Sequence, residues 1–362
     1  MKHYLSTDWL ILLLFACSGS MKDDGNSELL IILVNVAQNS PVRLSEIADD
    51  IRKIELETSD ECLIGRISQV VCKDDRIFVL DYQAGSLVHV FDLTGKFLYA
   101  INKRGQGPGD YLSIRTITVD PKNGHLYVAS QGGKILRFDT DTGHFIDECT
   151  NMGFIEYIRY ENDCLHVFSK EIRPSDDNSS TSITDFMVIY GNNWQPIDTV
   201  LLNKMILRGL QGSTLPNKDF ISTDNRNNLF VYCPVLLLEP FVRDTLYRLD
   251  KNILKPYAKL KFSDEDPSQK NKNILCISLT SNLLIAEYLS FSKKGNRYFC
   301  YDFRSKTGKN MLDGFQDDIF DTGVVAIRLL NDGYFYFWKE AEDLSPSGEE
   351  PNPTLYIGKF KD

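Results

Sequence analysis

The chain has 362 residues and a formal net charge of −10, with 43% hydrophobic and 25% charged residues. These proportions are typical of a folded globular protein and exclude extensive disorder. Lys and Arg are scattered along an acidic chain, so there is no basic patch of the kind that nucleic-acid binding requires. We therefore expect a folded protein that does not bind nucleic acid.

The N-terminus has the features of an export signal. Residues 9–16, WLILLLFA, form an apolar run that is shorter than the roughly 20 residues needed to span a bilayer and fits the core of a signal peptide. The LFAC sequence that ends at Cys17 resembles a bacterial lipobox, in which the cysteine is lipidated and becomes the mature N-terminus. A secretory signal with an incidental cysteine is the alternative. The lipoprotein interpretation predicts a signal peptide over residues 1–16 and membrane attachment through lipid alone.

A tether and a first strand are expected over residues 17–40. Residues 20–26, SMKDDGN, resemble the tag that sends some Gram-negative lipoproteins to the cell surface, although a solvated tether has the same composition. The apolar run at 29–37 would be an aggregation hazard if exposed, so we expect it to pair as a strand. One or two helical turns are expected around 44–51, and the alternating sequence at 51–57 predicts another strand.

From about residue 67 the sequence repeats a pattern of short strands. Residues 79–101 and 128–149 each combine an apolar strand, a glycine-containing turn, a strand that ends in Phe-Asp and a further strand. The third strands of successive units are about 50 residues apart, and their anchors are Phe91, Phe138, Tyr190, Leu249, Tyr301 and Tyr356. Units of this length suit propeller blades. We therefore predict an all-β fold, a six-bladed β-propeller of four-stranded antiparallel blades over residues 41–362.

The two ends of the propeller sequence predict how the ring closes. No outer strand for the sixth blade follows the strand around Tyr356, whereas the strand at 51–57 precedes the first complete blade. An N-terminal strand that completes the sixth blade would remove two open sheet edges, which otherwise invite aggregation. We therefore expect the ring to be closed by an N-terminal strand.

Residues 102–111, NKRGQGPGDY, form the strongest candidate site. The spacing fails to match a dinucleotide fingerprint, because the third glycine would fall on Asp110, and no P-loop sequence is present. Pro108 also lacks the backbone N–H that a phosphate nest would use. We predict a multiple turn that links the outermost strand of one blade to the innermost strand of the next. The candidate residues of this rim binding loop are Lys103, Arg104, Gly105, Gln106, Gly107, Pro108, Gly109, Asp110 and Tyr111.

Antiparallel alternation places this loop on the same rim as the loops between second and third strands. Long polar insertions are expected on that rim at 170–184, 203–219, 263–273 and 339–353. Gathered on one face, such loops predict a recognition surface. Surface loops that are merely tolerated are the alternative.

Four segments carry a family resemblance: residues 51–65, 76–98, 105–111 and 244–250. Together they resemble the six-bladed β-propeller lipoproteins of Gram-negative envelopes, which are relatives of the NHL-repeat propellers. The resemblance covers about residues 30–360, and GQGPG is its most specific part. It implies a propeller fold and a place in the cell envelope, lipid-anchored to the outer membrane on the periplasmic face or at the cell surface. It implies no settled activity and therefore no catalytic residues.

No constellation for catalysis or metal binding stands out in the sequence. Residues 139–143, DTDTG, resemble the start of a calcium loop but lack its third acidic position and distal Glu, so a hairpin turn is expected. His89 and His166 fall on strands away from the channel. The seven cysteines after Cys17 show no zinc-site spacing, and their odd number leaves at least one free thiol.

The most notable polar group on a predicted innermost strand is Glu156, beside Arg115 and Arg159, which we interpret as structural salt bridging. The prediction is therefore a non-catalytic binding or scaffold module, with no cofactor, for a protein or glycan partner in the envelope. The alternative is an NHL-like or lactonase-like enzyme with a divalent cation in the central channel, which would need ligands from several innermost strands.

Overall fold

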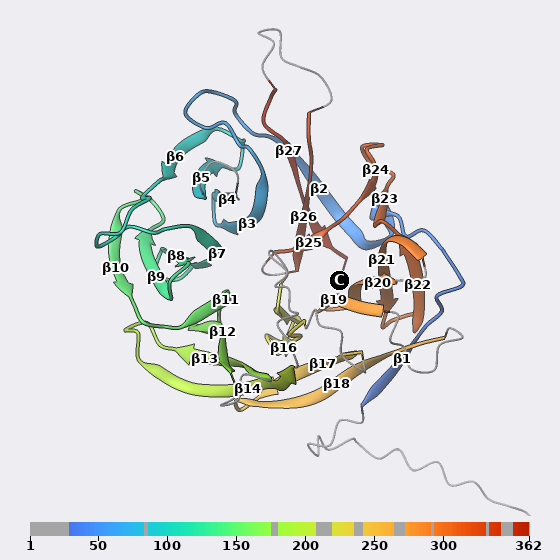
Figure 1. Ribbon diagram of the computed structural model, residues 1–362. Helices are drawn as coiled ribbons and strands as arrows, with labels where there is room; N and C mark the ends of the chain where they lie inside the picture. The colour runs from blue at the N-terminus through green and yellow to red at the C-terminus, as the bar shows by residue number, and fades with distance from the viewer. Residues whose placement is uncertain are drawn as a thin grey trace, which may run out of the picture.

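Six β-sheets are arranged as blades around a central axis (Figure 1). The computed structural model describes residues 29–82, 86–174, 180–207, 219–234, 242–263, 272–290, 293–330, 333–341 and 350–361. Neighbouring strands within each blade are antiparallel. The structure thus confirms the predicted six-bladed β-propeller of four-stranded antiparallel blades.

Within each blade the strands are given in order from the innermost, next to the axis, to the outermost. Blades 1 and 2 consist of β3 (Ile67–Lys73), β4 (Arg76–Asp81), β5 (Leu87–Asp92), β6 (Phe97–Ile101), and β7 (Ile114–Asp120), β8 (His125–Ser130), β9 (Lys134–Asp139), β10 (Phe145–Cys149). Blades 3 and 4 consist of β11 (Phe154–Glu161), β12 (Cys164–Pro174), β13 (Thr181–Tyr190), β14 (Pro196–Leu207), and β15 (Ile221–Thr223), β16 (Leu229–Val231), β17 (Thr245–Asp250), β18 (Ile253–Phe262). Blades 5 and 6 consist of β19 (Lys272–Leu279), β20 (Leu283–Ser290), β21 (Lys293–Asp302), β22 (Thr307–Leu312), and β25 (Arg328–Leu329), β26 (Tyr334–Lys339), β27 (Thr354–Phe360), β2 (Ala48–Glu55).

The hydrophobic core lies between the blades. Six clusters of buried apolar side chains, counted over the described residues, each join two neighbouring blades. The middle strands are therefore buried on both faces, as in β4, where Phe78, Val79 and Leu80 have no exposed surface. This explains why they read as continuous runs of β-branched and aromatic residues. The six anchors predicted from the repeat all lie on the third strand of their blade.

The N-terminal segment runs along the outside of blades 4 and 5 (Figure 1). β1 (Leu30–Val34) pairs with β18, as expected for an apolar run, but it does so in parallel. Asn310 of β22 then fixes the segment in blade 5, since its side chain donates a hydrogen bond to the Asn35 carbonyl and its own carbonyl accepts one from the Ser40 N–H. Residues 30–55 are called the N-terminal belt below.

The belt continues to blade 6. A single helical turn, α1 (Leu44–Ile47), lies beside the short hairpin of β23 (Phe315–Asp317) and β24 (Gly323–Val325). β2 follows directly and pairs with β27. It begins three residues earlier than the predicted strand and occupies the outermost position of the sixth blade, which is the pairing that the closure prediction requires.

Candidate binding rim and axial pocket

The glycine-rich loop connects β6 of blade 1 to β7 of blade 2, as predicted. Two backbone hydrogen bonds fold it back on itself, from the Gly105 N–H to the Tyr111 carbonyl and from the Tyr111 N–H to the Lys103 carbonyl. The Tyr111 side chain is 1% exposed, and its hydroxyl donates to the Ile101 carbonyl at 2.9 Å. The loop is therefore a closed turn anchored by a buried aromatic residue.

The glycines are needed because Asp110 folds inward over the loop. The Gly107 N–H donates to Asp110 Oδ2 at 3.1 Å, and a Cβ at Gly105 would lie 2.4 Å from the same oxygen. Gly109 has a φ of +77°, a conformation that glycine adopts without strain. Asp110 and the glycines therefore build the turn rather than present a binding group.

Blade 2 supplies the outer supports of the loop. The Gly109 N–H donates to Glu148 Oε2 at 2.8 Å, and Lys134 Nζ donates to the carbonyls of Gly107 and Asp110 at 3.3 and 3.1 Å. These backbone groups are thus occupied by protein partners, contrary to what a phosphate cradle needs. The loop residues that face solvent are Asn102, Lys103, Arg104, Gln106 and Pro108.

Tyr111→Phe should destabilise the protein by about 1–2 kcal/mol, because it removes a hydroxyl that both donates to Ile101 and accepts from the Lys103 N–H. The urea midpoint of unfolding measures this loss. An unchanged midpoint would mean that the hydroxyl does not hold the loop.

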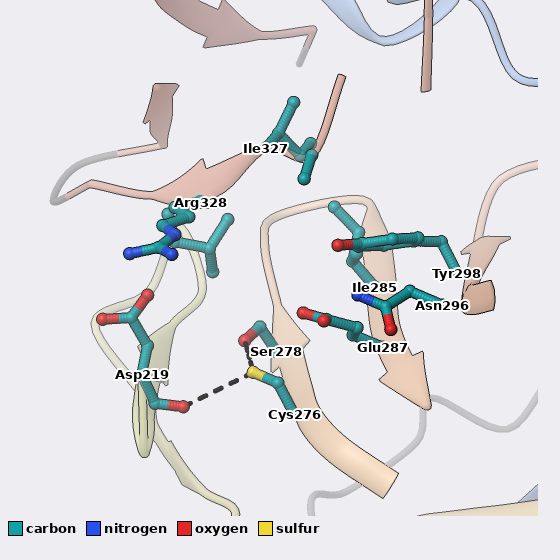
Figure 2. A pocket seen from close by; sticks show the side chains of 11 residues that line it. Asp219, Cys276, Ser278, Ile285, Glu287, Asn296, Tyr298, Ile327 and Arg328 are labelled. Atoms are coloured by element: carbon teal, nitrogen blue, oxygen red, sulfur yellow. Dashed lines mark hydrogen bonds between the residues drawn. The ribbon is translucent and has the colours of Figure 1, made fainter. Parts of the chain in front are cut away.

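A cavity of about 220 Å³ lies on the axis between blades 4, 5 and 6 (Figure 2). Its polar lining comes from the segment before β15, from β19, β20 and β21, and from β25: Asp219, Cys276, Ser278, Glu287, Asn296, Tyr298 and Arg328. Ile285, Ile327 and Leu329 supply apolar wall. This cavity is called the axial pocket below, and polar groups from three blades converge in it.

The side chains in the axial pocket are held by defined contacts. The Cys276 thiol lies 3.5 Å from the Asp219 carbonyl and 3.1 Å from the Ser278 hydroxyl. Burial raises the pKa of Tyr298, and the adjacent Glu287 carboxylate, to which the hydroxyl is hydrogen-bonded, raises that pKa further. Tyr298 is therefore a neutral phenol that donates to Glu287.

Arg328 is positioned by groups outside the pocket. Its Nη1 donates to the Ser68 carbonyl of blade 1 at 2.7 Å, and its guanidinium carbon lies 4.9 Å from the centroid of the Trp338 ring. Such stacking of a cation on an aromatic face is stabilising. The arginine thus joins blades 6 and 1 at the edge of the pocket.

A second polar group of residues, on the innermost strand β11 of blade 3, lies next to Asp219. Arg159 is buried, and its Nε donates to Glu161 at 3.0 Å. The Tyr157 hydroxyl lies 3.3 Å from Asp219 Oδ1. The space beside Arg159, Ser222 and neighbouring residues is only about 10 Å³.

The axial pocket and the glycine-rich loop lie on the same rim. Asp219 precedes β15, Ile327 precedes β25, and the loop at 102–111 precedes β7. Since the innermost strands of a propeller run in the same direction, the segments that lead into them share one rim. A larger cavity of about 390 Å³ lies at the seam of blades 6 and 1. Of its four charged lining residues, Asp50, Arg52 and Asp74 are solvent-exposed and Lys359 is half-buried.

The interpretation of Glu156 as a salt-bridging residue is confirmed. Its carboxylate pairs with Lys170 of β12 at 2.6 Å, not with Arg115, whose guanidinium stacks over the Phe154 ring at 4.4 Å, nor with Arg159. Salt bridging within blade 3 is therefore the role that the contacts give it.

The histidines, the DTDTG sequence and the cysteines occupy structural positions. His89 and His166 are buried in a third and a second strand, away from the axis. Asp139 of the DTDTG sequence accepts hydrogen bonds from Thr142 in the turn between β9 and β10. All seven described cysteines are free thiols. Within the described ranges no three His, Cys, Asp or Glu residues are placed to hold a metal ion, and the cation of the alternative function stays a prediction.

Several predictions concern residues that the structure does not describe. Cys17 and the signal peptide at 1–16 lie outside the described residues, as do parts of the four insertions: 175–179, 208–218, 264–271 and 342–349. The first insertion is shorter than predicted, because β12 extends to Pro174 and β13 begins at Thr181. Across the described part of the chain, no helix has the length and apolar character needed to cross a membrane.

The ring of six blades defines the protein as a six-bladed β-propeller. Residues 30–359 match the family model described as "Domain of unknown function (DUF4934)", and the chain belongs to this family. The expected relation to NHL-repeat propellers and to envelope lipoproteins stays a prediction.

Two solved structures illustrate the likeness in fold. A "putative exported protein" from Bacteroides fragilis NCTC 9343 is 18% identical, with a TM-score of 0.62 over 92% of this chain and 100% of that chain. The WD40 repeats of RRP9 are 12% identical, with a TM-score of 0.45 over 90% and 100%. No curated protein is significantly similar to the chain. At 18% identity the likeness to the exported protein shows the fold alone.

Proposed function

We propose that this protein is an exported, non-catalytic binding or scaffold module for a protein or glycan partner in the cell envelope. The observation that carries the proposal is the rim itself: a rigid glycine-rich loop with exposed Lys103, Arg104 and Gln106 shares a face with the axial pocket. Binding residues concentrate on loops that a rigid scaffold positions. Concave sites with a few convergent polar groups are the usual places for ligands.

Two features support the location in the envelope. The apolar run that ends at Cys17 has the length of an export signal, and a similar structure belongs to a protein described as exported. We include lipidation of Cys17 in the proposal as the means of attachment to the outer membrane. Several acyl chains on one cysteine would provide a stable anchor.

Replacing Lys103 and Arg104 together by alanine should lower partner retention on the purified protein by about tenfold or more, since about 1.4 kcal/mol of lost contact suffices for that factor. Retention is measured with solubilised envelope material and with an array of envelope glycans. The matched control is Lys96→Ala with Lys122→Ala, two exposed lysines in turns at the opposite rim. Equal retention by both double variants would contradict a role for the loop.

A further inference from the structure

We propose that the axial pocket binds an organic cation, an ammonium or guanidinium group on a short aliphatic stem. This inference deepens the proposed function, because it gives the chemistry of the group that the rim receives. The cation could belong to a free amine or to a Lys or Arg side chain of a protein partner.

The charge of the pocket favours a cation. Asp219 of blade 4 and Glu287 of blade 5 enter it from two sides (Figure 2), and among the described residues Arg328 is the one basic residue in its lining. Arg328 keeps its positive charge, because its contacts with the Ser68 carbonyl and the Trp338 ring are with neutral groups. The two carboxylates therefore leave these charged lining residues with one net negative charge. Carboxylates in a concave site with apolar walls create a focused negative potential, which attracts a positive group.

The hydrogen-bonding capacity of the pocket is mostly that of acceptors. Glu287 is 9% exposed, and its carboxylate accepts a hydrogen bond from the Tyr298 hydroxyl. An ionised carboxylate accepts hydrogen bonds and donates none, and this holds for both Glu287 and Asp219. An ammonium offers three N–H donors and a guanidinium five, with no acceptors. Charge-assisted bonds of this kind are the stronger ones.

The size and walls of the pocket select an organic cation over a bare metal ion. Its 220 Å³ is far more than the roughly 10–15 Å³ that a single bound water needs. Ile285, Ile327 and Leu329 line it beside the carboxylates, which suits a ligand with an apolar stem and a charged head. Lys and Arg side chains combine these two parts.

The test is calorimetric titration of the purified protein with agmatine, which carries both an ammonium and a guanidinium. We expect saturable binding that Glu287→Gln weakens about tenfold or more, the loss of about 1.4 kcal/mol of charge interaction. Asp219→Asn is the second variant, in case Glu287→Gln fails to fold, and urea unfolding verifies both. Glu55→Gln, an exposed carboxylate of β2, is the control that should bind like the wild type.

The outcomes separate this inference from the proposed function. Failure of agmatine to bind, or equal binding by wild type, Glu287→Gln and Asp219→Asn, overturns the cation site. The proposed function would still stand if partner retention depended on Lys103 and Arg104. Where agmatine binds and displaces the retained partner, the cation is a side chain of that partner; where it binds without displacement, the ligand is a free amine.

Discussion

Replacing Ile32 by alanine should lower the free energy of unfolding by about 2–5 kcal/mol, the usual cost of truncating a buried isoleucine. Ile32 is 2% exposed and packs with residues of blades 4 and 5. Its strand, β1, is held to the propeller by parallel pairing with β18. The loss would show that the N-terminal belt contributes to folding stability, and the urea midpoint measures it.

The neighbouring residue provides the control. Ile31 is 52% exposed on the opposite face of β1, so Ile31→Ala should change the stability by no more than about 0.5 kcal/mol. Both variants have the same composition and the same backbone pairing. Similar small effects for the two would mean that β1 does not contribute to the core.

The protein should lose stability as the pH falls below 6.5, because of His166. This residue is 2% exposed, its Nδ1 has no hydrogen-bond partner in the described structure, and burial lowers its pKa from 6.5 to about 4. The folded protein therefore keeps His166 neutral while the unfolded chain takes up a proton. The contribution of neutral His166 to the free energy of unfolding is fully present above pH 6.5 and is lost progressively towards pH 4. Between pH 7.5 and pH 5 the loss amounts to about 2 kcal/mol.

Urea unfolding of wild type and His166→Gln at about pH 7.5 and pH 5 isolates this effect. Burial also lowers the pKa of His125, which acts in the same direction in both proteins and cancels in the comparison. The wild type should lose about 2 kcal/mol more than the variant over this interval. Equal losses would show that another group causes the acid sensitivity.

The fold was largely predictable because its strands are long and regularly punctuated. Blades 1 and 2 read as runs of β-branched and aromatic residues between glycine and asparagine turns. β15 and β25 have only three and two residues, too few for a periodic signal. The alternation in β1 identifies its buried face but not its direction, so the parallel pairing with β18 could not be foreseen.

Of the candidate site, one part could be predicted from the sequence and one part could not. The glycine-rich loop could be placed between blades from its neighbouring strands, and its spacing excluded a nucleotide fingerprint. The axial pocket was missed because Asp219, Glu287 and Arg328 are isolated charged residues far apart in the sequence. Only the closed ring brings them together, and Asp219 and Arg328 lie at the two strands that were too short to predict.

The N-terminal belt also has a mechanical consequence. Any pull on the chain upstream of residue 29 reaches the propeller first at β1, where five residue pairs join it to β18 in register. A force directed along the strand axis would load these pairs together in shear, rather than opening them one at a time. The contacts of Asn35 and Ser40 with Asn310 would resist next. The seam made by β2 and β27 is therefore shielded from tension at the N-terminus by two blades that bear the load before it.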